Sequence, residues 1–362
     1  MDQVDQFIIG EMEKHHIPGL SVGLLQRDKL LFTKCYGYAN TELSVPTSQN
    51  TVFAIASITK LFTATAVMML AEAGLVAIDE PISRYLTTLP PAWSDITIRQ
   101  ILAHQSGIRS YTAVDAYWKS TRLDISKEEI LKLVSDHPLD FQPGEKHAYD
   151  NTGYYLLGLL IEMVSGMSYG DYLATQIFEP LEMTATRVND PYQIVEGRAA
   201  GYTHQSGVVK NTEYYSPSGT FSAGVLLSTV EDLAKWSQTL YTNQLLSAES
   251  RKSMWTPHRS KIENEDTFNF VMGLGWFLVN TQGDQFAGHN GSMVGFSSSF
   301  SHFFESKLTV IMLCNMDQIN MPHEIAHGVV ARYFDRLGLL QRRRPGGLGG
   351  SSPHRSFPSG TS

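Results

Sequence analysis

The chain has 362 residues, 42% of them hydrophobic, and a formal net charge of -8 at pH 7. A chain of this length and composition buries a substantial core, so we expect one large folded unit or two ordinary domains. It has no basic surplus with which to follow a phosphate backbone, which argues against nucleic acid as a partner.

The N-terminal region is predicted to fold as a helix followed by a β-hairpin. Apolar residues between Val4 and Met12 recur at helical spacing. Residues 20–25 and 30–36 are strand-like and flank a polar turn at 26–28. The hairpin would supply the first strands of a sheet.

The middle of the chain has a mostly helical pattern. Long periodic segments at 127–134 and 154–164 are separated by clusters of proline and glycine. We therefore predict a mostly helical lobe over residues 61–204.

Strand-like runs return in the C-terminal part at 274–279, 296–303 and 308–313, and a closing helix is expected at 324–337. Strands at both ends of the chain predict one antiparallel sheet, flanked by the first and last helices. The predicted fold class is α+β, with a discontinuous sheet lobe at 1–60 and 205–340. A cleft between this lobe and the helical lobe would hold the active site.

The cysteines and the termini indicate the compartment. Cys35 and Cys314 lie in apolar, strand-like runs, which favours buried thiols over a disulfide framework. Residues 1–16 lack the basic start of a signal peptide, and 61–78 is too short and too polar for a membrane span. We predict a cytoplasmic protein without membrane contacts, although a leader removed earlier would leave the same sequence.

Residues 341–362 are rich in Gly, Ser, Pro and Arg and are predicted to be a disordered tail.

Ser57 and Lys60 open a strongly helical run that ends near Gly74. At positions i and i+3 the two side chains lie on one helical face and can meet. The positive potential of a helix N-terminus favours a serine alkoxide and disfavours a charged lysine, and burial lowers a lysine pKa. The pattern predicts a serine nucleophile activated by the lysine. The alternative is a helix cap beside a solvated surface lysine.

Tyr149 and Asn151 follow a predicted turn at 142–145 and precede a helix that starts near Gly153. A tyrosine beside a lysine can shuttle a proton, because the cation favours phenolate. An asparagine amide can hold both the lysine and a substrate carbonyl. The alternative is an ordinary loop whose aromatic ring packs on neighbouring tyrosines.

The segment Gly288–Ser292 is set at the edge of a predicted strand, where its glycines let another backbone approach closely. His289 and Gly291 would line the edge along which a substrate lies. The backbone N–H groups of Ser292 and Ser57 would form an oxyanion hole for a tetrahedral intermediate. The alternative is a turn that carries an exposed histidine.

These three motifs, in this order along the chain, resemble the class C β-lactamase and DD-peptidase superfamily, which includes related esterases and D-aminopeptidases. The motifs are Ser57-x-x-Lys60, Tyr149-x-Asn151 and His289-x-Gly291. The flanking segments 17–22, 102–107 and 141–144 also look like this family. The similarity runs from about residue 4 to residue 338.

The resemblance implies a β-lactamase/transpeptidase-like fold and a reaction without a cofactor. In the family the serine is acylated, the lysine and tyrosine shuttle protons, and water releases the acid. These catalytic roles fall on Ser57, Lys60 and Tyr149, and the substrate-binding roles on Asn151, His289, Gly291 and Ser292. His289 stands where many lactamases have lysine, and an imidazole holds a substrate carboxylate less firmly than a permanent cation.

We therefore expect hydrolysis of an ester or amide through acyl-Ser57, with a small-molecule or short peptide substrate. A small ester is slightly preferred, since no leader directs the chain to a cell wall. The alternatives are a D-amino-acid-specific peptidase or DD-carboxypeptidase, a β-lactamase and, more remotely, a non-catalytic penicillin-binding-like sensor. Four aromatic residues are candidates for the pocket wall, although core packing explains each more simply: Tyr215, Phe221, Trp276 and Phe296.

One further motif competes with this interpretation. His323 and His327 flank Glu324 in the spacing of a zinc metalloprotease helix. Val330 and Tyr333 replace the glycine and histidine of the extended pattern, and no glutamate follows Glu324. An amphipathic C-terminal helix is favoured, and no metal site is predicted.

Overall fold

The computed structural model describes residues 2–258, 270–280, 284–319 and 321–336. The predicted disordered tail at 341–362 lies outside the described residues. The assignment of residues to a sheet lobe and a helical lobe stays a prediction.

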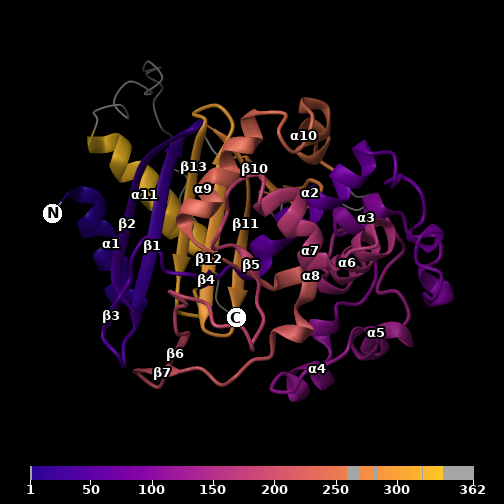
Figure 1. The fold of residues 1–362 in the computed structure, drawn as a ribbon, viewed down its shortest axis with the longest axis horizontal. Coiled ribbons are helices and arrows are strands. Elements are labelled where there is room, and N and C mark those ends of the chain that lie inside the picture. Colours follow the sequence, from indigo (N-terminus) through magenta and orange to yellow (C-terminus); the bar gives the residue numbers. More distant parts are fainter. Residues whose placement is uncertain (1, 259–269, 281–283, 320, 337–362) are drawn as a thin grey trace, which may run out of the picture.

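An eight-stranded antiparallel sheet is built from both ends of the chain (Figure 1). Its strands, in spatial order, are β3 (Val45–Pro46), β2 (Lys29–Asn40), β1 (Gly19–Gln26), β13 (Leu308–Cys314), β12 (Phe296–Phe303), β11 (Gln285–Met293), β10 (Phe277–Asn280) and β9 (Phe270–Met272). The pairing of β1 with β13 runs from Leu20 opposite Cys314 to Gln26 opposite Leu308 and joins the N-terminal hairpin to the C-terminal strands. This confirms the predicted α+β class.

Both faces of the sheet are covered, which explains why every residue of β13 is buried. Val310 and Met312 pack in a core shared with α1 (Gln3–Lys14) and α11 (Pro322–Arg336). Ile311, between them, points to the opposite face and joins the larger core. On that face α9 (Val230–Gln238) contacts β1 and β13.

Most of the other helices lie in the middle of the chain and pack beside this sheet (Figure 1). They are α2 (Thr59–Glu72), α3 (Ile98–Leu102), α4 (Asp115–Ser120), α5 (Lys127–Ser135), α6 (Asn151–Ser165), α7 (Tyr169–Leu173), α8 (Phe221–Gly224) and α10 (Ala248–Met254). Two small sheets complete the fold: β4 (Phe53–Ala54) with β8 (Leu226–Ser228) and β5 (Arg187–Val188), and β6 (Tyr202–Gln205) with β7 (Val208–Asn211).

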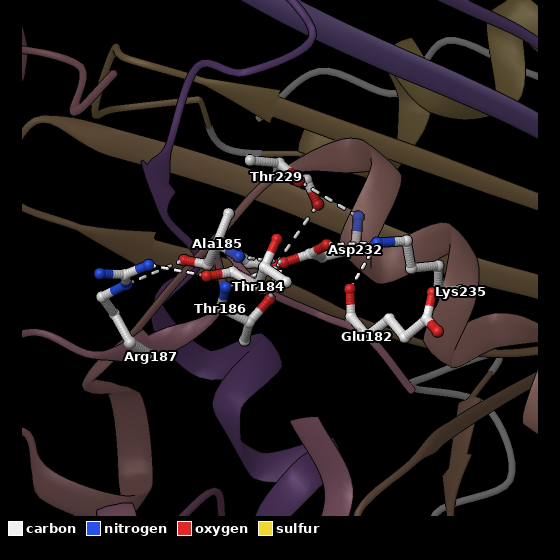
Figure 2. Close-up of polar contacts among 9 residues, drawn as sticks. Glu182, Thr184, Ala185, Thr186, Arg187, Thr229, Asp232 and Lys235 are labelled. Carbon is white, nitrogen blue, oxygen red and sulfur yellow. Dashed lines mark hydrogen bonds and ion pairs between the residues drawn. The ribbon is translucent and has the colours of Figure 1, made fainter. Parts of the chain in front are cut away.

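A buried carboxylate ties the segment before β5 to the start of α9 (Figure 2). Asp232 Oδ2 accepts hydrogen bonds from the backbone N–H groups of Ala185 at 2.8 Å and Thr186 at 2.9 Å. The Thr186 hydroxyl also donates to Oδ2, and Lys235 lies 3.3 Å from Oδ1. Thr229 caps α9 by accepting from the Asp232 N–H. The N–H groups of Ala185 and Thr186 are thereby paired inside the protein.

Candidate active site

Ser57 lies in a single 3₁₀ turn, Ala56–Ile58, directly before α2. The turn is entered at a φ of +46° at Ala56, a left-handed backbone angle that is uncommon for a residue with a side chain. Helix α2 is buried along most of its length, so its first turn is held on all sides. The strained entry therefore fixes the direction of the Ser57 hydroxyl, which faces a cavity.

Lys60 is completely buried, and its Nζ has three close neighbours. They are the Ala223 carbonyl oxygen at 2.7 Å, Asn151 Oδ1 at 2.8 Å and Ser57 Oγ at 3.3 Å. Burial holds the pKa of Lys60 well below its ordinary value, and the charge of Asp150 opposes this effect only in part. A neutral amine can donate to the two shorter contacts and turn its lone pair toward the Ser57 hydroxyl.

Tyr149 completes the group around Ser57. Its hydroxyl is hydrogen-bonded to Ser57, and its ring centroid lies 4.8 Å from Lys60 Nζ. Although Tyr149 as a whole is 41% exposed, the removal of its hydroxyl from water raises the pKa of the phenol, and the bond to Ser57 lowers it by a smaller amount. The protonated phenol is therefore favoured at neutral pH, whereas the sequence pattern led us to expect that a lysine cation would favour phenolate. The difference arises because burial disfavours both the ammonium and the phenolate.

Asn151 is the first residue of α6, and its amide is oriented from both ends. Oδ1 accepts from Lys60, while Nδ2 donates to Thr112 Oγ1 at 3.0 Å. The Asn151 backbone N–H donates to the Ser110 hydroxyl at 3.1 Å. Thr112 lines the same cavity, so sequence reasoning missed a residue that orients a predicted one.

Asp150 caps α6, which begins two residues earlier than predicted. Its carboxylate accepts from the backbone N–H groups of Thr152 and Gly153 and from the Ser106 hydroxyl at 3.0 Å. The Asp150 N–H donates to His104 Nδ1 at 3.1 Å, and the His104 ring packs 4.6 Å from the Tyr149 ring. Residues 102–107, noted in the sequence only as a matching flank, thus support the loop that carries Tyr149 and Asn151.

His289 lies within β11 and is buried, which excludes the alternative of a turn with an exposed histidine and places the residue inside a strand instead of at its edge. Its Nδ1 is 2.5 Å from the Asn290 carbonyl oxygen, so Nδ1 carries the proton that it donates. Burial, and then the charge of Lys60, lower the pKa of His289 to about 3. The ring is therefore neutral at physiological pH and supplies no positive charge to the site.

Gly291 brings β11 against the Ala56–Ile58 turn, which we call the nucleophile turn after the role predicted for Ser57. A Cβ at this position would lie 2.3 Å from the Ile55 carbonyl oxygen and 2.2 Å from Ser298 Oγ. The Ser298 hydroxyl donates to the Ile55 carbonyl at 2.9 Å, which ties β12 to the same turn. Ser57 and Ser292 both line the cavity, and the oxyanion hole expected from their N–H groups stays a prediction.

The cavity over Ser57 has a volume of about 560 Å³, within the range of small-molecule sites. Its aromatic lining consists of Tyr111, Tyr117, Trp118, Tyr149, Tyr215 and Phe277. Of the four aromatic candidates from the sequence, Tyr215 lines it. Trp276 lies in the core, Phe296 packs against that core, and Phe221 packs against Tyr155 and Tyr169.

His323 and His327, the histidines of the metalloprotease-like motif, lie on α11, which packs on the sheet. His323 Nδ1 is 2.9 Å from Asn290 Nδ2, and His327 Nε2 is 3.0 Å from Ser301 Oγ. Each ring is therefore engaged in packing α11 on the sheet. Within the described ranges, no group of three His, Cys, Asp or Glu side chains could hold a metal ion.

Comparison with known sequences assigns the family. The profile of the family described as Beta-lactamase matches residues 4–333. The chain belongs to the beta-lactamase family. This places it among hydrolases of the serine β-lactamase fold.

Two relatives of this beta-lactamase family protein are each 30% identical to it. One is penicillin-binding protein 4* of Bacillus subtilis strain 168, matched over 84% of this chain and 70% of the relative. The other is protein flp of Staphylococcus aureus strain N315, matched over 90% of this chain and 65% of the relative. The chain thus spans about two thirds of the length of both.

Solved structures agree with this family assignment. The octameric penicillin-binding protein homologue from Pyrococcus abyssi superposes with a TM-score of 0.82 at 29% identity, over 92% of this chain and 77% of that one. D-amino acid amidase from Ochrobactrum anthropi SV3, complexed with L-phenylalanine, gives a TM-score of 0.77 at 25% identity, over 93% and 99%. Among the helices that the structure describes, none is long and apolar enough to cross a membrane.

Proposed function

We propose that this beta-lactamase family protein hydrolyses a small ester or amide that has no charged group beside the scissile bond, through an acyl-enzyme formed on Ser57. One observation carries the proposal: a fully buried lysine amine lies 3.3 Å from the Ser57 hydroxyl oxygen. Serine is too weak an acid to attack at neutral pH without a neighbouring base. A lysine whose pKa is held down by burial is such a base.

In the acylation step, Ser57 Oγ attacks the substrate carbonyl carbon and its proton passes to Lys60 Nζ. The resulting tetrahedral oxyanion would be held by the backbone N–H groups of Ser57 and Ser292. Tyr149, protonated and bonded to Ser57, passes a proton to the leaving oxygen or nitrogen as the carbon–leaving-group bond breaks. Lys60 then returns its proton to Tyr149, which leaves acyl-Ser57.

In the deacylation step, water attacks the acyl carbon and its proton passes to Lys60 Nζ, with the Tyr149 hydroxyl as a relay. The ester bond to Ser57 breaks, Lys60 returns that proton to Ser57 Oγ through Tyr149, and the carboxylic acid leaves. Asn151 donates to the substrate carbonyl from the Nδ2 group that Thr112 and Lys60 orient. The cavity supplies binding through its aromatic walls.

The lining of the cavity favours a substrate that is uncharged next to its scissile bond. No described residue that lines it is a lysine, arginine, aspartate or glutamate, and the His289 ring is neutral. A substrate carboxylate beside the scissile bond would lose its hydration without gaining a cation. A small ester is therefore our first candidate, and a β-lactam with its carboxylate is disfavoured. The similarity to D-amino acid amidase supports a D-aminoacyl amide as the second candidate.

A rate panel tests this proposal. We expect short aryl esters to be hydrolysed faster than D-alanyl amides, and both faster than a chromogenic cephalosporin. Ser57→Ala should lower every rate by at least about 10³-fold and abolish the covalent adduct with a phosphonylating probe. Ser135→Ala, at the end of α5, serves as the matched control. It should keep the hydrolysis rates and form the adduct.

His289→Lys asks whether charge sets the substrate preference. It should raise the relative rate on the carboxylate-bearing cephalosporin, whereas His289→Gln should not. Wild-type protein that folds but forms no adduct and hydrolyses no member of the panel would contradict the enzyme assignment and favour a sensor.

A further inference from the structure

A second hollow of about 230 Å³ adjoins the cavity over Ser57. Tyr215, Met293 and Val294 line both spaces, so one wall is shared. The two hollows are therefore neighbours, and a substrate that occupies both would cross at these three residues. We call this hollow the side chamber.

The side chamber differs from the main cavity in charge. Arg198 and Glu213 line it, whereas the described lining of the main cavity has no charged side chain. Arg198 Nη2 donates to the Asp190 carbonyl oxygen at 3.3 Å. Asp190 stands between Asn189 and Pro191, which both line the side chamber. The guanidinium group therefore lies at the chamber wall.

The two charges in the side chamber are not equivalent. The Glu213 carboxylate accepts from Arg122 Nε at 3.1 Å and also pairs with its Nη2, so Glu213 is already neutralised. No carboxylate of the described residues forms an ion pair with Arg198. The Asp190 carboxylate, on the same loop, acts on Arg198 more strongly than the opposing charge of Arg187 does. Of the two charged side chains that line the chamber, Arg198 is thus the one without an ion pair to a described carboxylate.

We propose that the side chamber binds an anionic group, a carboxylate carried on the substrate away from the scissile ester or amide. The inference rests on the proposed function, because the substrate's neutral end occupies the cavity over Ser57. Arg198 would hold the carboxylate through two parallel N–H donors, the geometry that guanidinium groups favour. The enzyme would then select half-esters or half-amides of dicarboxylic acids, with the charged end remote from the reacting carbonyl.

A substrate series tests the side chamber. The substrates are p-nitrophenyl half-esters of dicarboxylic acids of increasing length, each compared with the same molecule capped as a methyl ester. At one chain length, wild type should prefer the free carboxylate by about tenfold in kcat/KM, expressed mainly in KM. Arg198→Gln should remove that preference and leave hydrolysis of the capped ester unchanged. Arg198→Lys should keep part of it.

Two controls separate this inference from its alternatives. Arg84→Gln changes the net charge equally at an exposed position and should keep the preference. Equilibrium binding of the carboxylate and capped compounds to Ser57→Ala, with and without Arg198→Gln, gives a readout that needs no hydrolysis. Binding that depends on Arg198 without turnover would uphold the side chamber and contradict only the proposed reaction. Equal binding of the carboxylate and capped compounds to Ser57→Ala would overturn the side chamber. An equal loss of kcat/KM on both compounds in Arg198→Gln would overturn it as well.

Discussion

At the scale of single residues, the surroundings of Asp150 change the pKa of a common side chain. It accepts three hydrogen bonds, which favour the carboxylate, yet burial outweighs them and raises its pKa to about 7. The same burial lowers the pKa of the neighbouring Lys60. Burial therefore disfavours the charged forms of both the acid and the amine, and with them a fully formed ion pair.

The raised pKa of Asp150 predicts a dependence of stability on pH. Between about pH 4 and pH 7 the unfolded chain has lost this proton and the folded protein has kept it. Raising the pH across that window should therefore lower the free energy of unfolding, by up to about 1.4 kcal/mol per pH unit. Asp150→Asn cannot titrate at this position. Wild type should therefore lose stability relative to the variant as the pH rises toward 7. Urea unfolding at pH 4.5, 6 and 7.5 measures it, and a difference independent of pH contradicts the assignment.

At the scale of elements, α9 connects the sheet to the loop before β5 through one carboxylate (Figure 2). Asp232 is 3% exposed and serves two backbone N–H groups and one hydroxyl. Its partner Lys235 is 40% exposed along the side chain. The hydrogen bonds to the buried backbone therefore contribute more to stability than the ion pair does.

Asp232→Ala should lower the free energy of unfolding by about 3 kcal/mol, because it leaves two buried N–H groups without an acceptor. Lys235→Met is the matched variant and should cost no more than about 1 kcal/mol, since it removes a partly exposed ion pair. Chemical denaturation of both proteins measures the contrast. Losses of equal size would show that the ion pair dominates.

At the scale of the whole molecule, the candidate site is assembled from distant parts of the chain. The nucleophile turn follows the N-terminal hairpin, Tyr149 and Asn151 precede α6, and β11 comes from the C-terminal strands. Gly291 sets how closely the sheet approaches the nucleophile turn. We therefore expect the proposed reaction to depend on the packing of the sheet against the helices as well as on the reacting groups.

Gly291→Ala should lower kcat/KM by about 10²-fold, because its Cβ would push the Ile55 carbonyl and the adjoining Ser57 out of position. Gly10→Ala is the control, since nothing lies within 4 Å of a Cβ added there. It should keep full activity and raise stability by about 0.5 kcal/mol. Ester hydrolysis and circular dichroism are measured for both. A fully active Gly291→Ala protein would show that the close approach is not required.

Much of the fold could be predicted because its signals are local. The hairpin at 20–36, strand 296–303 and the helix before residue 74 follow from hydrophobic period and turn residues. The segment 288–292 was harder to assign, because its glycines and polar residues resemble a turn. Its strand character comes from pairing with β12 along the whole of β11.

The sequence alone determined which reactive groups are present and that Ser57 and Lys60 share a helical face, because spacing on a helix is a local property. Tertiary structure decided the rest: the contact of Tyr149 with Ser57, the neutral His289, the burial of Lys60 and the position of Arg198 in the side chamber. A side chain's charge and reach depend on what surrounds it. Those surroundings come from segments far apart in the chain, which no local pattern records.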